Sequence, residues 1–168
     1  MASSGVHVRT SVHVSARAFT YLVNEINRVF LEAIQSSDLD PSDFVANQKV
    51  IENGLRTWMT LRQLEVAYLE IYDPRSDEVR TRVDLAIEFR DTGDEHYRTE
   101  IERVRSELGK SGKFAGCRYR VVVTTTPGAA PVQGWSDTTL RDVSHLSRYD
   151  IGEVIGTARA GALLSILR

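Results

Sequence analysis

Apolar side chains along residues 15–35 recur at intervals of three and four positions, the spacing of one helix face. These positions are Phe19, Leu22, Val23, Ile26, Phe30 and Ile34. The pattern predicts an amphipathic helix with Ser15 at its N-cap and an end near Gln35. Residues 1–13 are small, polar and β-leaning, so we expect a loose arm or an edge strand there.

A second helical pattern follows the turn sequence SSDLDPSDF. Its apolar positions are Val50, Ile51, Leu55, Trp58, Met59 and Leu61. Pro41 suits the first turn of such a helix, and Ser42 or Asp43 can supply capping oxygens. Gly54 lies inside the pattern and is unfavourable there, because glycine costs about 1 kcal/mol relative to alanine within a helix.

Two strands are predicted next. The segment LEVAYLEIY, residues 64–72, is apolar on both faces, as a central strand is. After a turn, residues 79–89 alternate, with Val79, Thr81, Val83, Leu85, Ile87 and Phe89 on one face and charges on the other. The pair predicts a hairpin with one covered face. We expect a solvated sheet face that carries Arg80, Arg82, Arg118 and Arg120, interleaved with Asp84 and Glu88.

Residues 91–112 predict a third helix, followed by the strand CRYRVVVTT at residues 117–125. In this helix Asp94 is the cap, Gly109 marks the end, and the apolar stripe consists of Tyr97, Ile101, Val104 and Leu108. The order helix, helix, strand, strand, helix, strand is typical of the α+β class. In that class, helices cover one face of a largely antiparallel sheet.

Residues 126–168 keep neither a helical nor a strand period for long. They contain the strand-like fragments EVIG and ALLSIL and a polar middle, SDTTLRDVSHLSRYD. An aperiodic connection of this length is uncommon in a compact domain unless it is functional or mobile. The segment is also too apolar for plain disorder. Its apolar residues need a place to be buried, namely Trp135, Val154, Ile155, Leu163, Leu164, Ile166 and Leu167.

The composition narrows the classes of function. A length of 168 residues fits one domain, and 42% apolar and 26% charged residues are ordinary for a globular chain. A net charge of −2 provides no basic surface for nucleic acid. The single cysteine, Cys117, excludes a disulfide framework. We expect a cytoplasmic protein, because the sequence has neither a signal-like segment nor a membrane-length apolar run.

No pattern for catalysis or for a cofactor emerges. GKSGK, residues 109–113, resembles part of a phosphate-binding loop, but the leading glycine of that motif would fall at Val104. The histidines lack the spacing of metal ligands, as they stand at His7, His13, His96 and His145. The acidic DEHY segment at residues 94–97 suits a helix start better than acid–base chemistry. We therefore expect no enzyme, metal or cofactor.

Three stretches carry a resemblance to a known family. SARAFTYLVNEINRVFLEAI is similar, in place and pattern, to the opening helix of HORMA domains. VIENGLRTWMTLRQLEVAYLEIYDPRSDEVRTRVDLAIEF is similar to the family's next helix, hydrophobic strand, short turn and alternating strand. CRYRVVVTTTPGAAPVQGW is similar to the strand and the proline and tryptophan segment that open the C-terminal region of spindle-checkpoint HORMA proteins. In its short loops, the chain resembles the bacterial HORMA proteins that are associated with cGAS/DncV-like nucleotidyltransferases in CBASS antiphage operons.

The resemblance implies one HORMA-like domain over residues 1–168. It would comprise an N-terminal arm (1–13), a core (14–125) and a mobile safety belt (126–168) that wraps around a partner's closure-motif peptide. The implied peptide-binding residues are Arg118, Tyr119, Arg120, Val121, Val122, Val123, Thr124 and Thr125, with Trp135 as a packing anchor of the belt. The implied belt hinge consists of Pro127, Gly128 and Gly134, and Gly152, Gly156 and Gly161 suit a segment with two positions.

The resemblance also implies protein partners. The closed, peptide-bound form would bind and activate a cGAS/DncV-like nucleotidyltransferase. A Pch2-type AAA+ ATPase would reopen the domain by engaging the N-terminal arm. Two alternatives stay open: a constitutive HORMA-like scaffold, whose tail is an ordinary meander of edge strands, and a small α+β enzyme or RNA-binding domain.

Overall fold

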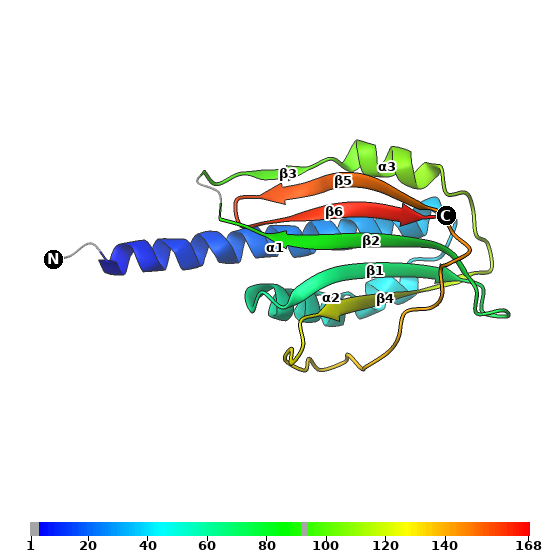
Figure 1. Cartoon of the computed structure of the whole chain (residues 1–168), viewed down its shortest axis with the longest axis horizontal. Coiled ribbons are helices and arrows are strands. Elements are labelled where there is room, and N and C mark those ends of the chain that lie inside the picture. Colours follow the sequence, from blue (N-terminus) through cyan, green and yellow to red (C-terminus); the bar gives the residue numbers. More distant parts are fainter. Residues whose placement is uncertain (1–3, 92–93) are drawn as a thin grey trace.

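The structure is a computed structural model that describes residues 4–91 and 94–168. The helices in these ranges are α1 (Ser4–Ser36), α2 (Ser42–Thr60) and α3 (Ile101–Gly109). The strands are β1 (Leu64–Tyr72), β2 (Val79–Phe89), β3 (Tyr97–Thr99), β4 (Arg118–Thr125), β5 (Arg148–Thr157) and β6 (Ala160–Leu167). The predicted α+β class is confirmed, because the helices pack on an antiparallel sheet (Figure 1).

Within the described ranges, all strands join one sheet in the order β3-β5-β6-β2-β1-β4. β1 and β2 form the predicted hairpin, with Glu70 opposite Arg82. β4 pairs with the other side of β1, and β6 pairs with the other side of β2. β4 therefore lies at one edge of the sheet. The C-terminal hairpin, formed by β5 and β6, lies on the far side of β2 (Figure 1).

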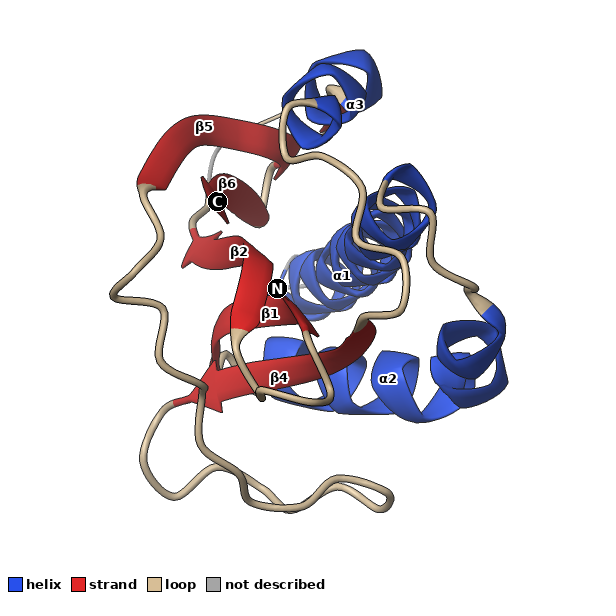
Figure 2. Cartoon of the chain, turned by 90° about the vertical axis from the view of Figure 1, so that its right-hand side faces the viewer, coloured by secondary structure: helices blue, strands red, loops and turns tan. Residues whose placement is uncertain are grey.

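The helices lie on one side of the sheet, and the core fills the space between them (Figure 2). All six apolar positions predicted for the first helix are buried. On α2, four of the predicted positions are buried, namely Ile51, Leu55, Trp58 and Met59. Val50 is half-buried, whereas Leu61 is 52% exposed because the helix has already ended at Thr60. The periodic patterns thus identified the core faces of both helices.

The first helix begins earlier than the sequence pattern predicts. α1 starts at Ser4, so Ser15 lies inside the helix and is not its N-cap (Figure 1). The expectation of a loose arm or an edge strand is therefore wrong for residues 4–13, and residues 1–3 lie outside the described part. Valine and threonine disfavour a helix by less than about 1 kcal/mol each. Extension of an existing helix also avoids the cost of nucleation.

The third helix is shorter than predicted. Tyr97–Thr99 form β3, which pairs with β5, and α3 covers only Ile101–Gly109. Val104 and Leu108 are buried as expected, but Tyr97 is 39% exposed. The N-cap position of α3 is Glu100, so Asp94 does not cap it. The backbone of residues 97–99 bonds to β5, which is distant in sequence, so the local helical pattern could not predict this pairing. Here the tertiary pairing determines the structure in place of the local pattern.

Residues 126–168 divide into two parts. Residues 126–147, here called the crossing loop, contain no helix or strand and connect β4 to β5. The C-terminal hairpin that follows includes both predicted strand fragments. Two of its glycines, Gly156 and Gly161, lie opposite each other and leave space for the ion pair between Arg90 and Glu153. Space for this ion pair accounts for both glycines.

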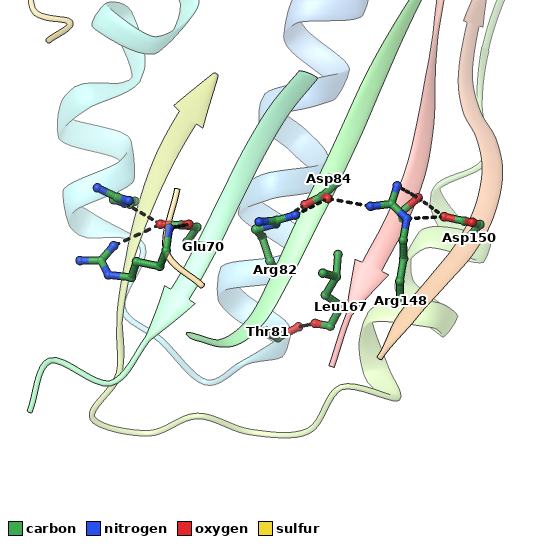
Figure 3. A network of polar contacts seen from close by, with 10 residues as sticks. Glu70, Thr81, Arg82, Asp84, Arg148, Asp150 and Leu167 are labelled. Carbon is green, nitrogen blue, oxygen red and sulfur yellow. Dashed lines mark hydrogen bonds and ion pairs between the residues drawn. The ribbon is translucent and has the colours of Figure 1, made fainter. Parts of the chain in front are cut away.

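The sheet face away from the helices carries buried charges (Figure 3). Arg82 is 8% exposed and Asp84 is 3% exposed. Nε and Nη2 of Arg82 donate to the Asp84 carboxylate at 2.7 and 2.9 Å. The expected solvated face is thus correct for Arg80 and Arg118 but wrong for Arg82 and Asp84. Arg82 lies on a central strand, where the ring of Tyr68 lies 4.9 Å from its guanidinium carbon and helps to exclude water.

Candidate functional site

β4 is an edge strand of the described sheet, with β1 as its neighbour. On its helix side, the hydroxyl of Tyr119 accepts a hydrogen bond from Phe44 N at 3.1 Å and donates to Asp40 O at 2.8 Å. Burial raises the pKa of the Tyr119 hydroxyl, so it keeps its proton at neutral pH. These bonds attach the beginning of β4 to the beginning of α2.

The crossing loop starts beside the end of α2. Thr126 N donates to Gln63 O at 2.9 Å, and Ala130 N donates to Oε1 of Gln63 at 3.2 Å. Nε1 of Trp58 donates to Ala130 O at 2.7 Å. The first residues of the loop are therefore held against α2, and the remainder runs alongside β4 before it passes the β1–β2 end of the sheet (Figure 1).

Trp135 attaches the crossing loop to α2. Its Nε1 donates to Val50 O at 2.9 Å, and its ring meets that of Trp58 edge-on, with centroids 5.0 Å apart. Gly54 provides the space, since a Cβ there would overlap the indole. Gly134 has a φ of +87°, which favours glycine, and its own missing Cβ makes room for Val50. The indole thus fills the space that a side chain at position 54 of α2 would occupy.

A cavity of about 520 Å³, here called the slot, separates β4 from the crossing loop. β4 contributes Val121, Val122, Val123 and Thr125, and the opposite wall contains Ala129, Ala130, Pro131, Val132 and Trp135. Consecutive strand residues point to opposite faces of a sheet. Three consecutive valines in the lining therefore place the slot along the edge of β4. In the described part of the chain, no backbone hydrogen bond joins residues 118–125 to the crossing loop.

A second cavity, of about 260 Å³, continues toward the beginning of β4. Its lining includes Tyr119 and Arg120 from the strand and Phe44 and Ile51 from α2. Val121 and Trp135 line both cavities. The wall on the helix side is therefore largely apolar and continues over several residues of the strand.

On the opposite side of β4, Arg120 connects the strand to the crossing loop. Its Nε donates to Glu70 at 2.6 Å, its Nη1 donates to Oγ1 of Thr138 at 3.0 Å, and its Nη2 donates to Thr139 O at 2.6 Å. Arg118 is exposed and forms no ion pair with any described residue. The two arginines predicted for the site thus differ, because Arg120 is structural and Arg118 faces solvent.

The structure brings together most of the residues predicted for the site. Those that line one or both cavities are Tyr119, Arg120, Val121, Val122, Val123, Thr125, Gly134 and Trp135. Arg118, Thr124, Pro127 and Gly128 line neither cavity. Gly128 has a φ of +76° and occupies the turn in which Ala129 N bonds to Thr126 O.

The sequence interpretation missed three partners of the crossing loop. Trp58 and Gly54 were assigned to the core and to a helix defect, respectively, although both contact Trp135. Glu70 is completely buried, and it binds Arg141 of the loop. A glutamate in the middle of a largely apolar central strand was the available signal, because buried carboxylates need a partner.

The remaining chemistry is sparse in the described residues. No three His, Cys, Asp or Glu side chains gather there as a metal site. None of the described helices has the length and apolar character to span a membrane. The cavities beside β4 therefore offer a surface for binding, with backbone groups and apolar side chains as its main features.

Structures of similar fold are known. A chain in the crystal structure of the mitotic checkpoint complex superposes with a TM-score of 0.66 and 16% identity, over 94% of this chain and 97% of that one. HTP-2 of C. elegans, bound to the HIM-3 closure motif, gives a TM-score of 0.57 and 14% identity, over 83% and 84% of the two chains. HTP-1 of C. elegans, bound to the same motif, gives 0.59 and 12%, over 91% and 87%.

At these identities, the structural likeness concerns the fold. No curated protein matches the sequence. A family model does, and its description is bacterial HORMA domain 2. The match extends over residues 5–168 and includes α2, β4, the crossing loop and the C-terminal hairpin. The chain therefore belongs to the bacterial HORMA domain 2 family.

Proposed function

We propose that this protein binds an extended peptide, which pairs as an additional strand with the free edge of β4 beneath the crossing loop. The observation that carries the proposal is the slot, because its lining follows consecutive residues of an edge strand. The HTP-1 and HTP-2 structures of similar fold contain a bound closure motif. The predicted belt, residues 126–168, then corresponds to the crossing loop and the C-terminal hairpin.

Physical chemistry supports this mode of binding. An edge strand presents backbone N–H and C=O groups without partners, and an added strand satisfies them along its length. The crossing loop occupies the other wall of the slot and is attached through Trp135. A peptide in the slot is enclosed between strand and loop, so its release requires the loop to move. We expect slow dissociation for that reason.

The walls of the slot also suggest the chemistry of the peptide. Side chains of a strand alternate between faces, so every second residue of the peptide would face α2. On that side it meets Val121, Val132 and Trp135, which favour apolar side chains. The residues between them would face Arg120 and Thr138, which favour polar or acidic groups. The proposed ligand is therefore a peptide with apolar residues at alternating positions.

We propose further that the peptide-bound form engages a cGAS/DncV-like nucleotidyltransferase and that a Pch2-type AAA+ ATPase releases the peptide. Both proposals rest on the resemblance to HORMA proteins of CBASS operons. The described N-terminal residues are helical from Ser4, so an ATPase would meet a helix at this end of the chain. Co-purification with such an enzyme in the presence and absence of peptide tests the first proposal.

Selection from a random dodecapeptide display library tests peptide binding. Wild-type protein should enrich peptides with apolar residues at alternating positions. Val121→Asp, which places a charge where both cavities meet, should abolish the enrichment. Val45→Asp is the matched control, because Val45 is 55% exposed and lines neither cavity. No enrichment by the folded wild type, or equal enrichment by Val121→Asp, would contradict the proposed function.

A further inference from the structure

The carboxylate of Glu70 lies on the sheet face away from the helices and is completely buried. Its Oε2 accepts hydrogen bonds from Nε of Arg120 at 2.6 Å and from Nη1 of Arg141 at 3.1 Å. Its Oε1 accepts a third bond, from the backbone N of Arg141, at 2.9 Å. Two of the three donors thus belong to one residue of the crossing loop. Figure 3 shows Glu70 with the dashed contacts around it.

Arg141 has further partners at the same end of the sheet. Its Nε donates to Oδ1 of Asp77, in the β1–β2 turn, at 2.8 Å. Its guanidinium carbon lies 3.6 Å from the centroid of the Tyr72 ring, which is a close cation–π contact. We call the five residues Glu70, Tyr72, Asp77, Arg120 and Arg141 the Arg141 cluster. It contains two carboxylates and two guanidinium groups, so its charges balance.

The cluster lies between two other attachments of the crossing loop. Before it, Trp135 is bound to α2. After it, Ser147 exchanges both backbone hydrogen bonds with Arg168, at 3.1 and 3.0 Å. Between these points, Asp137, Thr138, Thr139 and Asp142 are all exposed. His145, whose Nε2 lies 2.8 Å from Val79 O, is a further attachment, and it is also exposed. Arg141 therefore supplies the main buried polar contact of the loop segment that borders the slot.

We propose that Glu70 and Arg141 are positioning residues that hold the crossing loop closed over β4, and that separation of this pair is the step that opens the slot. What the slot binds rests on the proposed function. The closure itself rests on the contacts of the cluster. If the loop lifts, Glu70 loses two of its three hydrogen bonds and Arg120 also loses Thr138 and Thr139.

The energetic reason is that a buried carboxylate without its partners is strongly unfavourable, whereas the closed cluster compensates it. The planar guanidinium group reaches Glu70 and Asp77 while it stacks on Tyr72. This geometry is specific to arginine, because lysine has neither the fork of donors nor the flat face. The loop is therefore held in one defined position, and opening it breaks several contacts together.

Amide hydrogen exchange measured by NMR on the full chain, without peptide, tests the proposal. Arg141→Ala and Glu70→Gln should each accelerate exchange at Ser144 and Leu146 by about tenfold or more. The amides of these residues bond to Asp142 and Val143, so neither substitution removes their partners directly. Arg141→Lys should give an intermediate acceleration. Ser147, which is bound to Arg168 just after β6, should exchange as in the wild type.

Arg75→Ala is the matched control. Arg75 is exposed in the same β1–β2 turn, and its side chain forms no hydrogen bond or ion pair among the described residues, so this substitution should leave the loop amides unchanged. The double variant Glu70→Gln with Arg141→Ala should exchange no faster than the more affected single variant, because both remove one interaction. Should Glu70→Gln not fold, Arg141→Ala alone still decides, since its side chain lies outside the hydrophobic core.

Unchanged exchange at Ser144 and Leu146 in Arg141→Ala would overturn the proposal. Acceleration confined to the Arg141 amide in Glu70→Gln would also overturn it, because that pattern reflects one lost hydrogen bond and no movement of the loop. The result is independent of peptide capture. Faster exchange at Ser144 and Leu146 together with a failed peptide selection would support the proposal that Glu70 and Arg141 hold the loop closed, and it would contradict the proposed function.

Discussion

The indole of Trp135 lies directly against Gly54, where a Cβ would come within 2.9 Å of Cζ2 and would overlap Nε1 and Cε2. Gly54 is buried in the interior of α2, a position where glycine costs about 1 kcal/mol relative to alanine. The absence of a side chain lets the indole reach Val50 O, one helical turn earlier. The unfavourable glycine is thus the place where the crossing loop attaches to α2.

Gly54→Ala should therefore fail to stabilise the protein. Helix propensity favours alanine by about 1 kcal/mol, but overpacking against the indole costs about 1–3 kcal/mol. We expect an unchanged or lower free energy of unfolding in urea, and faster amide exchange at Trp135. Gly109→Ala is the control, because Gly109 ends α3 with no atom within 4 Å of its missing Cβ. If Gly54→Ala raised the free energy of unfolding as much as Gly109→Ala, the proposed contact between Gly54 and Trp135 would be contradicted.

The buried pair of Arg82 and Asp84 provides a second prediction. Asp84→Asn should lower the free energy of unfolding by about 3 kcal/mol, because it leaves a buried guanidinium without its carboxylate. Joint replacement by apolar residues, Arg82→Met with Asp84→Leu, should cost much less. Glu102→Gln breaks an exposed ion pair with Arg105 and should change the free energy of unfolding by less than about 1 kcal/mol. Equal losses for the single and the joint replacement would refute the buried-charge explanation.

The dependence of stability on acid pH is a third prediction. A hydrogen bond from the Ser165 hydroxyl, followed by one from Arg148, lowers the pKa of Asp150 below its ordinary value. The unfolded chain then binds more protons in acid, so this stabilisation is present above the unfolded pKa and is lost as the pH falls through the folded pKa. Asp150→Asn should give a flatter decline of stability below about pH 4 than the wild type.

Thermal unfolding between neutral and acid pH provides that comparison. Asp137→Asn serves as its control, because Asp137 is exposed and has no ion pair or hydrogen bond among the described residues. The control should retain the pH profile of the wild type. Identical profiles for all three proteins would show that the contacts of Asp150 contribute nothing to stability.

The sequence predicted those helices and strands in which the spacing of apolar residues matches the face that is buried. The apolar stripe of α1 and the alternation of β2 identify a face without reference to the rest of the chain. β3 and β5 are different, because their pairing partners are distant in sequence: Tyr97 lies opposite Thr157. Glycines at Gly152 and Gly156 also interrupt the strand pattern of β5. Such strands exist because of long-range pairing, which local patterns do not contain.

The same distinction applies to the candidate site. The residues of β4 predicted a strand, whereas its role in peptide binding and the role of Trp135 as a packing anchor of the belt were implied by the resemblance alone. The contacts of Trp135 with Trp58 and Gly54 were not predicted, because they join residues more than 70 positions apart. Glu70 and Arg141 were missed for a related reason: each is an ordinary charged residue in sequence, and only the fold places them in contact.

Pairing of a peptide with β4 is the central claim, and amide exchange in the presence of a peptide from the display selection tests it most directly. In an added strand, alternate amides of residues 119–124 donate to the peptide and should become strongly protected. The β1 amides that already pair with β2 should change little. Binding of the peptide without any new protection along β4 would place it elsewhere and would contradict the account.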